Sequence, residues 1–312
     1  MVPFLGYNPT LPGNRITSST TETRRRNRPE PVRMKSQESK TAIDKLRGAQ
    51  ETLLIPLWAR AVEASRPEPI LYDAKAVEII ASLDYDFSKF AGGRGAQTSC
   101  CLRAAIIDGW VRQFLQEHPD GTVVEIGAGL DTRFERLDNG RVRWFDLDLP
   151  EAMEVRRRFF TESDRRTFLA QSVFEPDWID VVRRASAGPA MFMGEGVLYY
   201  FEEERVKEIF ALLARHFPGC LVAFDSHTPL SLAYSNRRDP IRNMRARMVW
   251  AIRNIQEIAT WAPGYEVVES VPLWDAPEYA KYACRLPWTL RLINAIFPPS
   301  RRMYRIDLVR LG

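Results

Sequence analysis

Two glycines and two acids near the middle of the chain have the types and spacing of a nucleoside-binding site. Gly127 and Gly129 follow one apolar run, and Asp146 and Asp148 end a second apolar run roughly 20 residues later. Glycines let the backbone approach a ligand closely, and an acid at the end of the next strand can accept hydrogen bonds from ribose hydroxyls. Residues 122–150 therefore predict a strand, a glycine-rich turn, a helix and a second strand that hold a nucleoside.

The glycine-rich turn departs from the dinucleotide fingerprint G-x-G-x-x-G. Thr132 stands where the third glycine would be, and Asp131 precedes it. A carboxylate there would repel a pyrophosphate at the start of the following helix. It would not repel a cationic or zwitterionic ligand. The turn therefore points away from NAD and towards S-adenosylmethionine, which carries sulfonium and ammonium groups, with a plain βα turn as the alternative.

The positive charge of the chain is concentrated at its N-terminus. The 312 residues carry a net charge of +4, yet residues 1–48 hold ten Lys and Arg against four Asp and Glu. Residues 1–40 are also rich in polar residues, which predicts a basic, flexible extension. The near-neutral remainder disfavours a nucleic-acid partner, because phosphate binding needs a basic surface.

Several features of the chain indicate a cytoplasmic protein with no membrane partner. No apolar run is long enough to cross a bilayer, and the N-terminus lacks the pattern of a signal peptide. The four cysteines show no C-x-x-C spacing, which favours free thiols in a reducing compartment. Three scattered histidines and the absence of paired cysteines argue against a catalytic metal.

Alternating strand and helix patterns predict an α/β fold with a doubly wound parallel sheet. Helical periodicity before the sheet predicts an N-terminal helical cap over 41–118. An amphipathic stretch after the fifth strand predicts inserted lid helices over 229–262. The expected cap helices are 41–65, 73–82 and 99–117; the expected strands are 122–127, 141–147, 167–171, 190–194, 220–225, 265–273 and 303–311; the helices between them are 150–160, 176–186 and 202–216.

Four motifs in order resemble the leucine carboxyl methyltransferase and TcmP-like O-methyltransferase family, the latter named for tetracenomycin polyketide tailoring. They are LRA at 102–104, EIGAGLDTR at 125–133, FDLDLPEAM at 145–153 and GEGVLYYF at 194–201. The resemblance covers roughly residues 40–312, the expected methyltransferase domain being 41–312. It implies a class I methyltransferase sheet of seven strands with the last antiparallel, Rossmann-like in its nucleoside-binding half. Helical additions close over the substrate, and S-adenosylmethionine is the cofactor.

The resemblance also implies roles for single residues. Arg103 matches the arginine that holds the methionine carboxylate, a task that suits a bidentate guanidinium. Asp148 matches the acid on the ribose hydroxyls, and Glu195 matches the acid near the amino-acid end of the cofactor. The other expected cofactor-binding positions lie in the same motifs and comprise Glu125, Gly127, Gly129, Asp131 and Leu149.

One position departs from the family pattern. The family usually places an aspartate after the third strand, against the adenine amino group, where this chain has Gln171 and Ser172. The Gln171 carbonyl can still accept that hydrogen bond, and the Ser172 backbone can serve the ring. We therefore expect adenine binding to survive the change.

Two residues are candidates for work on the methyl acceptor. A carboxylate acceptor is already ionised, whereas a phenol with a pKa near 10 benefits from a general base. His227, which we place after the fifth strand, is the base candidate, with a surface-loop histidine as the alternative. Tyr200 matches a tyrosine of the family and could line the acceptor pocket.

Three functions are compatible with these residues. The leading one is an S-adenosylmethionine-dependent O-methyltransferase that acts on a hydroxyl or carboxyl group of a small, polyketide-like natural product. The second is a protein or peptide carboxyl methyltransferase, which would need an open groove for a chain terminus. The third is a non-catalytic partner protein that binds the cofactor, although such a protein has no reason to keep Arg103, Asp148 and Glu195 together. The oligomeric state is left open.

Overall fold

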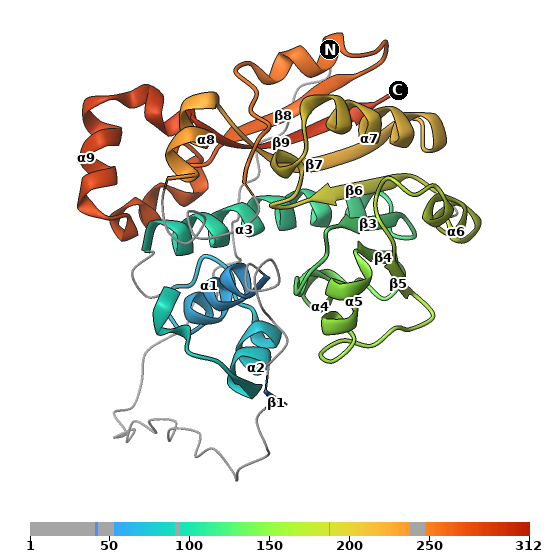
Figure 1. Cartoon of the computed structure of the whole chain (residues 1–312), viewed down its shortest axis with the longest axis horizontal. Helices are drawn as coiled ribbons and strands as arrows, with labels where there is room; N and C mark the ends of the chain where they lie inside the picture. Colours follow the sequence, from blue (N-terminus) through green and yellow to red (C-terminus); the bar gives the residue numbers. More distant parts are fainter. Residues whose placement is uncertain (1–40, 43–52, 91–93, 187, 238–246) are drawn as a thin grey trace, which may run out of the picture. The chain divides into compact units, whose positions relative to one another are not determined.

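The computed structural model describes residues 41–42, 53–90, 94–186, 188–237 and 247–312 (Figure 1). The expected flexible extension, residues 1–40, lies outside the described residues. Within the described ranges, no helix has both the length and the hydropathy needed to cross a membrane.

A seven-stranded sheet with the order β5-β4-β3-β6-β7-β9-β8 forms the centre of the fold. The strands from β3 to β7 are parallel, and β9 runs antiparallel to both of its neighbours. This confirms the expected α/β class and the expected sheet. The strands are β3 (Thr122–Ile126), β4 (Arg143–Asp148), β5 (Arg166–Ala170), β6 (Ala190–Gly194), β7 (Cys220–His227), β8 (Glu266–Pro272) and β9 (Tyr304–Leu311).

The strand order places a ligand crevice at the carboxyl end of β3. The chain continues from β3 to β4 on one side, and β6 pairs with β3 on the other. In open α/β sheets, ligands bind outside the carboxyl ends of the strands at such a switch point. The glycine-rich turn, Asp148 and Glu195 all follow strands that end here.

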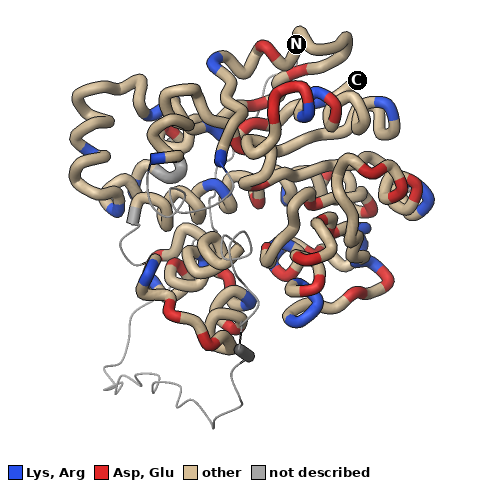
Figure 2. Tube along the Cα trace, in the orientation of Figure 1, with Lys and Arg blue, Asp and Glu red and all other residues tan. Residues whose placement is uncertain are grey.

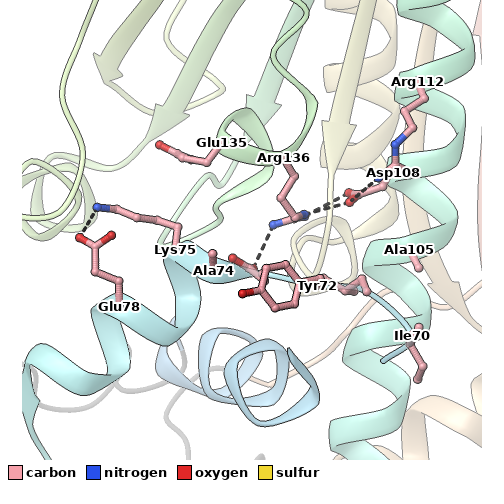
Figure 3. Close-up of a pocket in the computed structure, with 12 residues that line it drawn as sticks. Ile70, Tyr72, Ala74, Lys75, Glu78, Ala105, Asp108, Arg112, Glu135 and Arg136 are labelled. Carbon is pink, nitrogen blue, oxygen red and sulfur yellow. Dashed lines mark hydrogen bonds and ion pairs between the residues drawn. The ribbon is translucent and has the colours of Figure 1, made fainter. Parts of the chain in front are cut away.

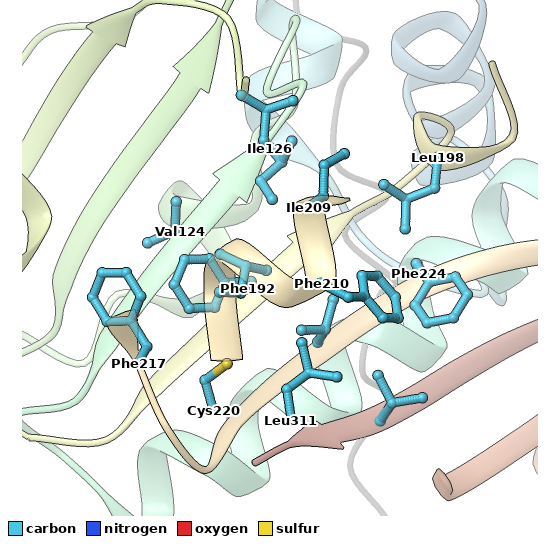
Figure 4. Packing of buried hydrophobic residues seen from close by; sticks show 14 of the residues in the cluster. Val124, Ile126, Phe192, Leu198, Ile209, Phe210, Phe217, Cys220, Phe224 and Leu311 are labelled. Carbon is cyan, nitrogen blue, oxygen red and sulfur yellow. The ribbon is translucent and has the colours of Figure 1, made fainter. Parts of the chain in front are cut away.

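One face of the sheet is covered by α6 (Asp177–Ala185), α7 (Glu203–His216) and the 3-10 helix η5 (Ile255–Thr260). Their apolar side chains pack against alternate strand residues to form a cluster rich in aromatic rings (Figure 4). Because side chains alternate across a strand, the intervening residues face the opposite side. That side packs against α3 (Arg94–Glu117) and α4 (Arg133–Leu137).

The N-terminal cap contains α1 (Leu54–Ala64) and α2 (Ala74–Ser82), which pack with α5 (Pro150–Arg156) in a third apolar cluster. The expectation of a helix from residue 41 is wrong at its start. Thr41–Ala42 form β1, a short strand that pairs in parallel with β2 (Leu83–Asp84), so their backbone is extended. Residues 43–52 of that expected helix lie outside the described residues.

Among its described residues, the segment expected to form lid helices, 229–262, is helical only at its two ends. It contains α8 (Pro229–Ser235) and η5, while residues 247–254 form an extended strap. The Val249 amide donates to the Tyr199 carbonyl at 2.8 Å, and the Ile252 amide donates to the His227 carbonyl at 2.9 Å. These bonds to neighbouring segments replace the internal bonds of a helix. Residues 238–246 lie outside the described residues.

Short helices complete the connections between the strands. The 3-10 helices η2 (Phe87–Phe90) and η3 (Leu198–Tyr200) precede α3 and α7, respectively. The connection from β8 to β9 holds η6 (Pro277–Arg285), α9 (Trp288–Ile296) and η7 (Pro298–Arg302). In Figure 1, α9 lies at the periphery of the fold.

Candidate functional site

The glycine-rich turn needs both of its predicted glycines for reasons that are visible in the backbone. Gly127 and Gly129 have φ angles of +69° and +44°, which L-residues with side chains rarely adopt. A Cβ atom on Gly127 would lie 2.4 Å from a methyl group of Val197, and one on Gly129 would lie 2.9 Å from Leu53. Backbone conformation and steric contact therefore favour glycine at both positions, most strongly at Gly127.

Asp148 ends β4 and ties its strand to the turn. One carboxylate oxygen accepts from the Gly129 amide at 2.7 Å, and the other accepts from the Leu149 amide at 2.7 Å. Burial raises the pKa of Asp148, and these two hydrogen bonds oppose that rise. Each oxygen keeps a lone pair, so the acid can still receive hydroxyl donors from a ligand. The Leu149 side chain is exposed beside it.

A buried arginine on α5 donates to the backbone of the glycine-rich turn. Arg156 on α5 donates from Nη1 to the Ala128 carbonyl at 3.1 Å and to the Gly129 carbonyl at 2.8 Å. Its Nη2 lies 3.1 Å from an Asp146 oxygen, and the second Asp146 oxygen accepts from Arg166. Asp146, the first acid of the sequence motif, is therefore a structural anchor that faces α5.

Arg103 on α3 meets two acids and a tyrosine. Its Nε donates to Glu195 at 2.9 Å, and its Nη1 donates to Asp225 at 2.8 Å and to the Tyr304 hydroxyl at 2.9 Å. Burial lowers the pKa of Arg103, but its acidic partners outweigh burial and hold that pKa well above its usual value. Its Nη2 makes no hydrogen bond within the described part of the chain, so this nitrogen is the one left to donate to a ligand.

Asp225 organises this end of the site, although the sequence analysis gave it no role. Beside Arg103, it accepts from the Tyr304 hydroxyl at 2.6 Å and from the Gly196 amide at 2.7 Å. A signal was available in the sequence, because Asp225 lies near the end of an apolar strand, two residues before His227. Tyr304 gave no signal, since its strand reaches the site only through antiparallel pairing with β7.

Arg133, the last residue of the GAGLDTR motif, connects Glu195 to the acids behind it. The fully buried guanidinium contacts Asp108 at 2.7 Å, Glu125 at 2.8 Å and Glu195 at 2.5 Å. Burial raises the pKa of Glu125 well above its usual value, and its second oxygen has no partner among the described residues. In this structure Glu125 positions Arg133; its expected contact with the cofactor remains a prediction.

The expectation that the Asp131 carboxylate would repel a pyrophosphate needs correction. Far from being an unpaired acid, it lies 3.3 Å from Arg133 and within 4 Å of Arg60 and Arg136. Burial raises its pKa, but these guanidiniums outweigh burial and lower it overall. Asp131 alone therefore cannot repel an anion.

The charges of the whole network nearly balance. It joins four largely buried arginines, and the exposed Arg112 at its edge, to six acids, and burial favours the neutral form of one of these acids, Glu125. The four arginines and six acids are Arg60, Arg103, Arg133, Arg136, Asp73, Asp108, Glu125, Asp131, Glu195 and Asp225.

The end of β5 carries an acceptor that fits an adenine amino group. The Gln171 amide donates to the Asp148 carbonyl at 3.0 Å, which fixes the two strand ends together. The side-chain oxygen of Gln171 is buried and has no hydrogen-bond partner among the described residues. The Ser172 hydroxyl accepts from the Phe174 amide at 3.3 Å. A buried carbonyl without a partner, close to Asp148, is what an amino donor would satisfy.

Aromatic rings gather beside Arg103, and they include both residues that were expected to act on the acceptor, Tyr200 and His227. The His227 ring stacks on Tyr304 with ring centres 4.3 Å apart, and Tyr199 packs edge-on against His227 at 5.3 Å. Tyr200 lies 4.9 Å from Tyr199 and is only half-buried. Burial also raises the pKa of both tyrosines, so their hydroxyls stay protonated at neutral pH.

The position of His227 differs from both predictions made from the sequence. It is the last residue of β7, not part of a loop after it, and only 6% of its surface is exposed. Its Nδ1 lies 2.9 Å from the Ser231 hydroxyl. Burial lowers the pKa of His227 to about 4, so the ring is neutral at physiological pH. The surface-loop alternative is therefore wrong, and a role as base remains a prediction.

A cavity of about 620 Å³ lies elsewhere, between the start of α2, the middle of α3 and α4 (Figure 3). Arg136 spans it to reach Asp108 and Asp73, and Lys75 pairs with Glu78 at its rim. None of the residues expected to bind cofactor or acceptor lines this cavity, so it does not mark the predicted site. Within the described ranges, no group of acids, histidines and cysteines could hold a metal ion.

Comparisons with known proteins agree with the fold and the motifs. Residues 54–214 match the profile of the family described as leucine carboxyl methyltransferase. The tetracenomycin polyketide synthesis O-methyltransferase TcmP of Streptomyces glaucescens is 34% identical over 234 residues, which cover 75% of this chain and 86% of that protein. The S-adenosyl-L-methionine-dependent methyltransferase dpfgK of Gibberella zeae is 28% identical over 271 residues, or 80% and 91% of the two chains.

A solved structure supports the fold alone. A DUF574 family protein from Streptomyces avermitilis superposes with a TM-score of 0.52 at 14% identity, covering 82% of this chain and 97% of that one. The expected family, fold class and enzyme class, a methyltransferase that uses S-adenosylmethionine, are thus confirmed. The roles of single site residues remain predictions.

Proposed function

The chain belongs to the leucine carboxyl methyltransferase family, and on that premise we propose that it methylates a hydroxyl group of a small aromatic, polyketide-like acceptor. When bound, S-adenosylmethionine supplies a methyl group on a sulfonium that is already activated for displacement. The protein is then left with orientation, desolvation and control of one proton. Orientation of this kind can supply roughly 7–11 kcal/mol of the barrier.

The cofactor end of the site follows the carboxyl ends of four strands. Asp148 would receive ribose hydroxyls, the orphan Gln171 oxygen would receive the adenine amino group, and the remaining Nη2 of Arg103 would donate to the methionine carboxylate. Glu195, between Arg103 and Arg133, lies where it can attract the methionine ammonium group.

The observation that supports an aromatic hydroxyl acceptor is the ring cluster around His227. Tyr199, Tyr304 and His227 form a continuous aromatic wall against Arg103, and flat rings stack well on such a wall. In the tautomer whose Nδ1–H donates to the Ser231 hydroxyl, Nε2 of the neutral His227 ring carries a lone pair that can take the hydroxyl proton as the new carbon–oxygen bond forms. A carboxylate acceptor would have no use for that lone pair.

His227 is a weak base, so its contribution depends on timing. Its pKa of about 4 lies far below the value near 10 of a free phenol. Proton transfer before attack would therefore be strongly uphill, whereas the oxygen becomes much more acidic as it acquires the methyl group. We propose that His227 receives the proton late, and that the rate has no acid limb between pH 6 and 8 from this residue.

The test is methyl transfer from labelled S-adenosylmethionine to matched phenolic and carboxylic aromatic acceptors. The product's stability to mild alkali identifies the group, because aryl methyl ethers survive and methyl esters release methanol. Alkali-stable product and a loss of about 10²-fold or more in kcat for His227→Gln would support the proposal. Alkali-labile product, or a His227→Gln variant with unchanged kcat, would contradict it.

The carboxyl alternative is tested by the same assay. A peptide ending in a free carboxylate should become an alkali-labile ester if the chain is a protein or peptide carboxyl methyltransferase. Calorimetric titration with S-adenosylmethionine and NAD in parallel separates a wrong acceptor from a wrong cofactor site, because it needs no acceptor turnover.

A further inference from the structure

The helix α9 exposes an apolar face that the fold leaves uncovered. Trp288 and Ile296 are 73% and 74% exposed, and Leu292 lies between them in the same helical row. Ile293 and Phe297 form the neighbouring exposed row. Five large apolar side chains on one short helix form a contiguous patch, a feature typical of interaction sites. We call these five residues the α9 face.

The α9 face belongs to an anchored helix. At the edge of this face, Leu290 lies so near Gly95 of α3 that a Cβ there would be 3.1 Å from it. Leu286, just before α9, is buried, and the Ser300 hydroxyl after α9 donates to the Asn294 side-chain oxygen at 2.7 Å. The helix is thus held at its edge and at both ends, while the five apolar side chains stay exposed.

Basic residues surround the α9 face. The sequence from Lys281 to Arg305 holds six Lys and Arg and no Asp or Glu. Figure 2 shows basic positions without acids along this stretch of the trace. Arg285 pairs with Glu63, and Arg301 and Arg302 approach Asp275 only at 3.7 and 3.5 Å. Lys281 and Arg291 are exposed and make no ion pair with a described residue, so their charges are available to an external anionic surface.

We propose that the α9 face docks the protein on an anionic lipid surface. A helix with Trp, Leu, Ile and Phe on one side and flanking Lys and Arg lies in the plane of a membrane interface, with the apolar side among the acyl chains. A lipid surface also requires no complementary shape, which suits a convex helix. Peripheral docking of this kind differs from a spanning segment, and it revises the expectation that no membrane partner is involved.

The charges disfavour the other occupants. Residues 1–48, which include the N-terminal extension, carry a net charge of +6, and the sequence 238–246 is also basic, so neither complements the flanking arginines. A second copy related by a two-fold axis would bring the two basic stretches together. An acidic partner protein would also satisfy the charges. In that case the chain would not sediment with the anionic vesicles described next.

The experiment is sedimentation of the full chain with vesicles of phosphatidylcholine, with or without phosphatidylglycerol. Binding is expected to the anionic vesicles and to fall as salt rises. The double variant Trp288→Ser/Ile296→Ser should weaken binding by about a hundredfold or more, because each buried large apolar side chain changes a transfer equilibrium by about tenfold or more. Arg301→Gln/Arg302→Gln should weaken it by about fivefold per charge.

Matched controls keep the proposal falsifiable. Tyr72→Ser removes an aromatic side chain of similar exposure, 67%, from a different surface and should leave vesicle binding unchanged. Circular dichroism and thermal unfolding check that each variant is folded. Equal binding by wild type and the Trp288→Ser/Ile296→Ser variant would overturn the proposal. So would binding lost only in Arg24→Gln/Arg25→Gln/Arg26→Gln, or self-association that depends on the α9 face without vesicle binding.

Discussion

The two faces of the central sheet are built on different principles. The face under α6 and α7 is an apolar layer in which Phe192, Phe210 and Phe224 interdigitate (Figure 4). The face under α3 also has an apolar layer, but towards the carboxyl ends of the strands it buries charged residues such as Arg133 and Asp225. Burying charges costs free energy unless each has partners, whereas burying apolar area is favourable. The face under α6 and α7 therefore stabilises the fold. The face under α3 lowers part of that stability, because it holds charged side chains in fixed positions.

The largest expected effect is the removal of the network's centre. Arg133→Met would leave Asp108, Glu125 and Glu195 without their shared partner, so we expect the free energy of unfolding to fall by about 3–5 kcal/mol. Binding of S-adenosylmethionine should weaken as well, because Glu195 keeps Arg103 but loses the partner that holds its second oxygen. Urea unfolding and calorimetric titration measure the two effects.

The exposed arginine of the Arg141–Asp120 pair offers a control for that variant. Arg141→Met should leave both measurements unchanged, since exposed ion pairs contribute little. A stable Arg133→Met variant would mean that the two faces do not differ in the way described.

A substitution in the apolar face should change the stability of the protein but not its affinity for S-adenosylmethionine. Leu213→Ala removes a fully buried side chain from α7, and we expect the free energy of unfolding to fall by about 2–5 kcal/mol. Affinity for S-adenosylmethionine, measured on the folded protein, should not change. A large loss of affinity would show that the two faces are coupled more closely than their separate clusters indicate.

The third prediction concerns positioning. Asp225→Asn keeps the shape of the side chain but removes the charge that holds Arg103 and Tyr304. A hydrogen bond to a charged group contributes about 1.5–3 kcal/mol, so affinity for S-adenosylmethionine should fall by about tenfold or more. The rise should be in KM for the cofactor, with a smaller change in kcat. Tyr304→Phe should act in the same direction with a smaller effect; an effect on kcat alone would argue against positioning.

The smallest effect is a dependence of stability on pH. Burial raises the pKa of Asp307 to about 6 from a usual value of 3.8, although Ser226 and Ser270 donate to it. The folded state then binds this proton more tightly than the unfolded state, so the contribution to stability is lost as pH rises from about 4 to about 6. Asp307→Asn should remove that slope and stabilise the protein above pH 6 on the order of 1–3 kcal/mol. Parallel slopes in wild type and variant, measured by urea unfolding across this range, would show that another group is responsible.

The sequence predicted the sheet well because each strand is a short apolar run between turn residues. The Gly127–Gly129 turn and Asp148 were found because their roles depend on local spacing. It predicted the lid segment poorly, since Trp250 and Ile252 lie in an extended strap whose hydrogen bonds go to distant residues. Asp108 and Tyr304 were missed for the same reason: their partners are far away in sequence and meet only after the sheet has formed.

The two hydrogen bonds from Arg156 to the carbonyls of Ala128 and Gly129 have a consequence for the kinetics of ligand association. They hold the turn in its glycine-dependent shape before any ligand arrives. Binding then does not have to restrict the backbone of the turn, so little conformational entropy is lost at that point. Rapid mixing with S-adenosylmethionine should accordingly give a single phase whose rate rises linearly with ligand concentration, without the plateau that a slow ordering step would impose.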